Sequence, residues 1–199
     1  MASFAQLQRS ALSGIATPGH FGRAGATGLT ILERTDIAFA SVIAKRDKRA
    51  TLVAAVDTAF GVTLPQAPRR ATKGPVTFAG TGPGQWIASA EGAEGFAAKL
   101  RSRLGPFAMV TDQSDARLVL HLSGARVRDV LAKGVPVDLH PKSFRVGDVA
   151  TTLVAYIGVQ IDRIDEATWQ LGAPRSMAGS FWSWLSASAG EFGYDVVTR

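Results

Sequence analysis

The chain has 199 residues and a formal net charge of +6, with 46% hydrophobic and 19% charged residues. This length predicts one domain, or two tightly joined halves, with a core that needs no covalent cross-links. The sequence contains no cysteine, which excludes disulfides, thiolate catalysis and cysteine-ligated zinc or iron–sulfur sites. It also has no run of about 20 apolar residues and no secretory signal at its N-terminus, so we expect a cytoplasmic protein without a membrane contact.

The positive charge is concentrated in three basic clusters, at residues 45–49, 69–73 and 101–103. Such clusters attract the phosphates of nucleic acids. However, they are not interleaved with the aromatic residues on which bases usually stack. The charge pattern therefore favours solvated surfaces or an acidic protein partner, and we expect no nucleic acid. An RNA-binding module is the alternative that the net charge leaves open.

The first 28 residues are rich in Gly, Ala and Ser and lack periodicity, which predicts a flexible N-terminal arm. From residue 29 onward, hydrophobic periodicity predicts pairs of strands that are each followed by a helix. The predicted strands are residues 29–34, 37–44, 75–79, 85–90, 107–111, 117–122, 149–156, 160–164 and 168–171. The predicted helices lie between Asp47 and Gly61, at 96–104, between Ser123 and Gly134, and at 176–192.

A strand–strand–helix unit thus occurs four times, with an extra strand in the last copy. Hairpin turns require antiparallel neighbours, so recurring units of this kind predict an α+β fold with mostly antiparallel sheets covered by helices. Two ferredoxin-like halves related by duplication, about 29–105 and 106–199, would accommodate the order within a single domain at 29–199.

Local signals set the predicted ends of these elements. Asp47 and Ser123 are expected to cap the helices that follow them. Gly61 is expected to close the first of these helices, and Gly134 to end the other in the left-handed conformation. Residues 62–75 hold three prolines and are expected to form a surface connection.

The glycine-rich run at residues 80–84 has the composition of a phosphate-binding loop. A dinucleotide fingerprint places its glycines between a strand and a helix, whereas this run lies between two predicted strands. Pro83 also lacks the N–H that such a loop would donate. A hairpin turn is the favoured interpretation. No predicted strand precedes Gly22, Gly25 and Gly28, so their spacing is an equally weak indication of a phosphate-binding loop.

The chain has only three histidines, and none lies in a nucleophile motif. His20 lies in the predicted arm, and His121 lies on a predicted strand face. His140 follows Asp138 at a spacing that would suit an oriented imidazole or two metal ligands, but two ligands do not make a metal site. A loop histidine bonded to backbone is favoured. Three acids are expected to form a polar turn rather than an acid–base pair: Asp162, Asp165 and Glu166.

The last predicted helix has a broad apolar stripe that faces the core. Trp182 lies about 100° around the helix from Phe181. This tryptophan either packs within the domain or anchors a subunit interface, where tryptophan is enriched. The residues alone therefore indicate an α+β domain with no convincing catalytic residue.

Three stretches carry a distinctive order of residues. The longest is Val-Arg-Asp-Val-Leu-Ala-Lys-Gly-Val-Pro-Val-Asp-Leu-His-Pro-Lys-Ser-Phe at 127–144, with Gly147 just after it. The second is Gly-Pro-Gly-Gln-Trp at 82–86. The third combines Pro-Arg-Ser at 174–176, Phe-Trp-Ser-Trp-Leu at 181–185 and Glu-Phe-Gly-Tyr at 191–194. In this order, from about residue 29 to the end, they resemble the gamma subunit of heterotetrameric sarcosine oxidase.

The resemblance implies the fold of the N-terminal, folate-binding-type domain of aminomethyltransferases, in agreement with the α+β prediction. It also implies membership of a complex that oxidatively demethylates sarcosine to glycine. That complex passes the one-carbon unit to tetrahydrofolate, or releases it as formaldehyde, and reduces oxygen to hydrogen peroxide. The resemblance further implies that FAD, FMN, NAD and tetrahydrofolate belong to the alpha and beta subunits, and zinc to the delta subunit.

This chain is thereby implied to be a non-catalytic assembly component, packed chiefly against the alpha subunit, with beta and delta as further partners. No catalytic, cofactor-binding or metal-binding residue is assigned to it. Trp182, His140 and Phe144 are the candidate interface residues, and the Asp138–His140 segment is then a fixed loop. The alternative is a stand-alone, folate-binding, aminomethyltransferase-like protein.

Overall fold

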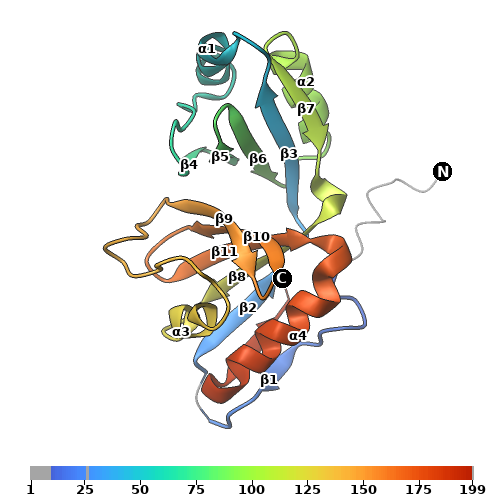
Figure 1. Cartoon of the computed structure of the whole chain (residues 1–199). Coiled ribbons are helices and arrows are strands. Elements are labelled where there is room, and N and C mark those ends of the chain that lie inside the picture. Colours follow the sequence, from blue (N-terminus) through green and yellow to red (C-terminus); the bar gives the residue numbers. More distant parts are fainter. Residues whose placement is uncertain (1–9, 26, 199) are drawn as a thin grey trace, which may run out of the picture. The chain divides into compact units, whose positions relative to one another are not determined.

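The computed structural model describes residues 10–25 and 27–198 (Figure 1). It divides into two compact units, neither of which is one continuous stretch of sequence. The first unit comprises Met1–Thr35, Asp115–Val146 and Thr151–Arg199, and the second comprises Asp36–Ser114 and Gly147–Ala150. The predicted halves at 29–105 and 106–199 differ from this division. Residues 29–35 join the C-terminal part of the chain, and residues 106–114 join the middle part.

The first unit is built on seven strands. They are β1 (Gly19–Phe21), β2 (Leu29–Glu33), β8 (Arg117–Ser123), β9 (Val149–Val154), β10 (Ile157–Arg163), β11 (Thr168–Pro174) and β12 (Tyr194–Val197). Their order in the sheet is β1-β12-β2-β8-β11-β10-β9. The β12–β2 pair is parallel, whereas the pairs β1–β12, β2–β8, β8–β11 and β11–β10 are antiparallel.

Two helices of the first unit, α3 (Val127–Ala132) and α4 (Ala178–Ala189), pack against each other, and α4 packs on β11. Short 3₁₀ turns at Arg175–Met177 and Gly190–Phe192 flank α4. The predicted inward face of α3 is confirmed, because Val127, Val130 and Leu131 are all buried. No helix in the described part of the chain is both long and apolar enough to cross a bilayer.

The second unit has a five-stranded antiparallel sheet with the order β4-β5-β6-β3-β7. Its strands are β3 (Ile37–Ala44), β4 (Arg70–Lys73), β5 (Val76–Gly82), β6 (Gln85–Glu91) and β7 (Ala108–Asp112). The helices α1 (Arg49–Phe60) and α2 (Phe96–Leu104) pack on each other, and α2 packs on β3 and β7. Between helices and sheet lies an apolar core that includes Val42, Leu52, Phe78, Trp86 and Leu100.

The predicted α+β class with mostly antiparallel sheets is confirmed, as is the hairpin of β5 and β6 around the glycine-rich run. Two other predicted hairpins are wrong. β2 and β3 follow each other in sequence, but β2 pairs with β8 and β12, whereas β3 pairs with β6 and β7. β7 and β8 likewise lie in different sheets, with a 3₁₀ turn at Ser114–Ala116 between them. In both cases the chain passes from one unit to the other at the predicted turn.

Several predicted helix ends are also wrong. Among the described residues, α1 begins after Lys48 and α3 after Arg126, each without a side-chain cap, so neither Asp47 nor Ser123 serves that role. Gly61 does end α1 in the left-handed conformation, with a φ of 65°. The φ angle of Gly134 is not positive, so this position requires glycine for steric reasons rather than for its backbone conformation. A Cβ built there would lie 2.7 Å from Cζ2 of Trp184.

The predicted surface connection at 62–75 is wrong in part, because it contains strand β4 and the buried side chains of Val62 and Leu64. The same connection binds residues 147–150, which belong to the second unit. The Arg70 N–H donates to the Gly147 carbonyl over 2.8 Å, and Arg69 Nη1 lies 2.5 Å from Asp148 Oδ1.

The predicted N-terminal arm contains an element that composition did not indicate. Strand β1 pairs with β12, and the rings of Phe21 and Tyr194 stack with centroids 5.5 Å apart. Beside them, His20 Nδ1 lies 2.6 Å from Asp195 Oδ1, and Thr27 Oγ1 donates to Asp195 Oδ2. Strand β1 and Thr27 are therefore bound to the C-terminal strand β12, while residues 1–9 and 26 of the predicted arm lie outside the described residues.

Candidate functional site

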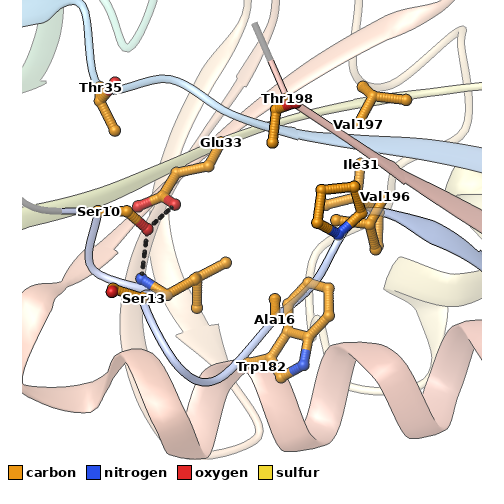
Figure 2. Close-up of a pocket in the computed structure, with 12 residues that line it drawn as sticks. Ser10, Ser13, Ala16, Ile31, Glu33, Thr35, Trp182, Val196, Val197 and Thr198 are labelled. Carbon is orange, nitrogen blue, oxygen red and sulfur yellow. Dashed lines mark hydrogen bonds between the residues drawn. The ribbon is translucent and has the colours of Figure 1, made fainter.

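The first unit contains a pocket of about 260 Å³, which Figure 2 shows in close-up. Its walls come from four places in the sequence: the segment before β1, strand β2 with Thr35 two residues beyond its end, helix α4, and the end of β12 with Thr198 after it. The apolar lining residues are Leu12, Ala16, Pro18, Ile31, Trp182, Val196 and Val197, and the polar ones are Ser10, Ser13, Glu33, Thr35 and Thr198. The pocket is thus mostly apolar, with one carboxylate at its rim.

That carboxylate holds the N-terminal wall in place. The Ser10 hydroxyl donates to Glu33 Oε2, and the Ala11 N–H donates to Glu33 Oε1 over 2.8 Å. The Ser10 hydroxyl oxygen also accepts a hydrogen bond of 3.0 Å from the Leu12 N–H. Two of these three contacts are visible as dashed lines in Figure 2. Both carboxylate oxygens therefore stabilise a turn, which is the arrangement expected of a structural group.

Trp182 forms the floor of the pocket on α4 (Figure 2). Its side chain points toward the recess, and the residue is only 9% exposed. The ring meets Tyr194 edge-on, with centroids 6.3 Å apart, and burial raises the pKa of the Tyr194 phenol. Of the two alternatives for Trp182, the structure shows packing within this unit, with one side of the ring left facing the pocket.

The chemistry available in this pocket is limited. Among the described residues that line it, none is His, Lys or Arg, and its one acid already accepts two hydrogen bonds. The Ser10 hydroxyl donates to the Glu33 carboxylate, but that carboxylate also accepts the Ala11 N–H and the Ser10 oxygen accepts the Leu12 N–H, so the pair holds a turn rather than activating a nucleophile. The volume is also below the roughly 300–1,000 Å³ of typical small-molecule sites. The pocket is suited to receiving an apolar side chain rather than to catalysis.

His140 lies on an exposed turn after α3 and is bonded to the backbone, as predicted. The His140 N–H donates to Asp138 Oδ1 over 2.9 Å, and the Lys142 N–H lies 3.2 Å from His140 Nδ1. Hydrogen bonds from Ser143 and from the His140 N–H lower the pKa of Asp138. Asp138 therefore stabilises the turn as a carboxylate and does not orient an imidazole for proton transfer.

Phe144, the third candidate interface residue, is only 5% exposed. Its ring stacks on Trp169 with centroids 5.5 Å apart, and Arg163 Nη1 donates to its carbonyl over 2.7 Å. The residue therefore fixes the loop to the core of the first unit. It does not present its ring to solvent.

The remaining sequence candidates are structural as well. His121 Nε2 lies 3.1 Å from Gln170 Oε1 on the neighbouring strand, as a strand-face histidine should. Asp162 was expected in a turn with Asp165, but it is buried on β10 and accepts a hydrogen bond of 2.8 Å from Gln160. Sequence reasoning also gave no signal for Glu33, whose partners lie more than 20 residues away.

A sequence model of the "Sarcosine oxidase, gamma subunit family" matches residues 46–191. The chain belongs to this family. A curated relative, sarcosine oxidase subunit gamma of Corynebacterium sp. (strain P-1), is 39% identical over 118 residues, which are 58% of this chain and 58% of the relative. The chain thus matches somewhat more than half the length of that gamma subunit.

The sarcosine oxidase gamma fold is also found in solved structures. A chain of the heterotetrameric sarcosine oxidase from Corynebacterium sp. U-96 superposes with a TM-score of 0.82 at 29% identity, covering 94% of this chain and 97% of that chain. Aminomethyltransferase T of the glycine cleavage system from Bartonella henselae superposes with a TM-score of 0.62 at 15% identity, covering 86% of this chain and 48% of that chain. The second likeness shows a shared fold and nothing further.

Zinc and flavins, which the resemblance implies for the other subunits, need metal ligands or a phosphate cradle. Among the described residues, no three His, Asp or Glu side chains come together as metal ligands. The glycine-rich run is a hairpin turn between β5 and β6 and is not followed by a helix. The described residues therefore offer neither a metal centre nor a dinucleotide cradle.

Proposed function

We propose that this chain is the non-catalytic gamma subunit of a cytoplasmic heterotetrameric sarcosine oxidase, in which it supports assembly and packs chiefly against the alpha subunit, with beta and delta as further partners. The observation that carries the proposal is the match over nearly the whole length of both chains to one chain of such a complex. The limited chemistry of the described pocket supports the non-catalytic role.

The complex would oxidatively demethylate sarcosine to glycine and reduce oxygen to hydrogen peroxide. The one-carbon unit would pass to tetrahydrofolate or leave as formaldehyde. FAD, FMN, NAD and tetrahydrofolate would be bound by the alpha and beta subunits, and zinc by the delta subunit. This chain would contribute a folded surface and no reacting group.

Two of the candidate interface residues suit such a surface. Trp182 offers one side of its ring at the floor of an apolar pocket. His140 is exposed on a turn whose backbone is held by internal hydrogen bonds. Phe144 would act indirectly, because its buried ring fixes the same loop.

The direct test is to express the chain alone and together with the other three subunits of its own organism. We expect it to co-purify with a flavoprotein that turns over sarcosine, and to show no turnover alone. A chain that never co-purifies with the flavoprotein would contradict the proposal. Calorimetric binding of tetrahydrofolate to the isolated chain would instead support the stand-alone folate-binding alternative.

A further inference from the structure

Two of the three basic clusters of the sequence meet at one end of the second unit. Strand β3 leads into α1 through a turn at residues 45–48 (Figure 1), in which the Lys48 N–H donates to the Lys45 carbonyl over 3.0 Å. Lys45 also bonds to the chain just after α2, because its Nζ donates to the Gly105 carbonyl over 2.6 Å and its N–H to the Phe107 carbonyl over 2.9 Å. The start of α1 and the end of α2 therefore both adjoin this turn.

The surface formed there is positive by its own local residues. We call it the basic end of the second unit, and its six exposed cations are Lys45, Arg46, Lys48, Arg49, Arg101 and Arg103. Asp47 is the only acid in the two stretches that supply them, 45–49 and 101–103. The strand register places Glu91 and Asp112 farther back along β3, away from this end. The positive charge is therefore concentrated and not spread over the unit.

Helix stability does not account for the cations at the start of α1. The N-terminus of a helix carries a partial positive charge, so acids stabilise it and cations do not. Arg49 is the first residue of α1, Lys48 precedes it without a side-chain cap, and the first turn contains no acid. By contrast, Arg101 and Arg103 in the last turn of α2 have the sign that the dipole favours. In the described part of the chain, the side chains of Arg46 and Lys48 also have no internal ion pair or hydrogen bond. Residues that oppose a local rule in this way indicate a role outside folding.

Two exposed hydrophobic residues adjoin the basic end. Ile43 of β3 and Met109 of β7 are partners in the strand register, and they are 44% and 62% exposed. Val42 and Ala108 belong to the core beneath the helices, so by strand alternation Ile43 and Met109 lie on the opposite face of the sheet. Ile43 is two residues before Lys45, at the end of the strand pair where the cations gather. An apolar area with a charged border, containing Met and Arg, is the usual composition of a protein–protein interface.

From these observations we infer that the basic end of the second unit, with Ile43 and Met109 beside it, docks on an acidic protein face within the oxidase complex. That face would present exposed carboxylates to the cations and an apolar area to the two hydrophobic side chains. A second copy of this chain is unsuitable, because two identical basic ends would repel each other at contact. Nucleic acid is unsuitable as well, because Phe107 is the only aromatic residue in 43–49 and 101–109 on which a base could stack, and it is partly buried. The inference rests on the proposed assembly role.

The test reverses charges in the full chain, which is co-expressed with the other subunits. The double variant Arg46→Glu/Lys48→Glu should weaken assembly at least about tenfold, because it sets carboxylates against carboxylates. It should keep or raise the melting temperature of the isolated chain, because acids suit the start of α1. Lys73→Glu/Arg128→Glu is the matched control, since it changes the net charge equally at exposed residues of β4 and α3 and should assemble like the wild type. Met109→Ser should weaken assembly without any change of charge.

Assembly is measured as the dissociation constant of the complex, by mass photometry on serial dilution at low and high salt. The difference between the wild type and the double variant should shrink at high salt, because exposed charges are screened. A double variant that assembles as tightly as the matched control would overturn the inference. So would binding of the isolated chain to RNA or to anionic lipid vesicles that the double variant loses, if its assembly with the other subunits were unchanged. Failure of the wild-type chain to bind the other subunits at all would instead contradict the proposed function.

Discussion

Gly134→Ala is the substitution whose effect the structure determines most sharply. Gly134 has no positive φ, so alanine is compatible with the backbone and would by itself stabilise the fold by about 0.4–1 kcal/mol. Its Cβ, however, would lie 2.7, 2.9 and 3.0 Å from three atoms of the Trp184 indole. Ordinary carbon–carbon contacts are about 3.5–4.0 Å, so the ring must move by nearly 1 Å. Overpacking of this kind costs about 1–3 kcal/mol.

Subtracting the gain from the cost leaves a net destabilisation of about 0–2.6 kcal/mol, with a middle value of about 1.3 kcal/mol. Urea unfolding should show a lower midpoint at an unchanged slope. In a Trp184→Ala background the steric conflict is gone, so the same substitution should stabilise the chain by about 0.4–1 kcal/mol. We therefore expect a double-mutant cycle to show that Gly134→Ala changes the free energy of unfolding with opposite signs in the two backgrounds. If Gly134→Ala stabilised the wild-type chain, the contact with Trp184 would not be the reason for glycine at this position.

Three further predictions concern the ends of the chain and the loop after α3. The hydrogen bond to Asp195 raises the pKa of His20, and the bond to His20 lowers the pKa of Asp195. The stabilisation from protonated His20 is complete below pH 6.5, the ordinary histidine pKa, and is lost as the pH rises through the raised pKa of His20. The stabilisation from ionised Asp195 is complete above pH 3.8, the ordinary aspartate pKa, and is lost as the pH falls through its lowered pKa. Hydrogen-exchange protection of β1 should thus be greatest between these values, and His20→Gln should abolish its decline on the alkaline side. Phe144→Ala should cost about 3–5 kcal/mol of unfolding free energy, because it removes a buried ring. His140→Ala should stay within about 0.5 kcal/mol of the wild type and should leave flavin turnover of the assembled complex intact; a large loss of turnover would show that His140 takes part in the reaction.

Local sequence signals predicted the elements better than their partners. Phe96 and Leu100 place α2 correctly, because helical periodicity depends only on near neighbours. The pairing of β2 was missed because the turn at residues 35–36 resembles a hairpin turn, and nothing local reveals that β2 finds its neighbours at β8 and β12. Strand β1 was missed for the same reason. Its hydrogen-bonding partners lie about 175 residues away.

In the candidate site, too, local features could be predicted from the sequence and long-range contacts could not. Trp182 was identifiable from the helical pattern, since its position beside a core stripe can be read from the sequence. Glu33 and Ser10 were not, because neither residue type nor spacing indicates that a strand carboxylate will stabilise a turn 22 residues earlier.

The discontinuous makeup of the two units has a consequence for synthesis. The five strands of the second unit all lie between residues 37 and 112, so its sheet can form while the rest of the chain is still being translated. The seven-stranded sheet is different, because β12 separates β1 from β2 and is not made until residues 194–197. Until then the apolar strand β2 keeps an open edge, and such edges invite pairing with other chains. Ribosome-bound intermediates should therefore contain a folded second unit beside an unfinished first one, and shortening the C-terminus by a few residues should cause aggregation rather than local fraying.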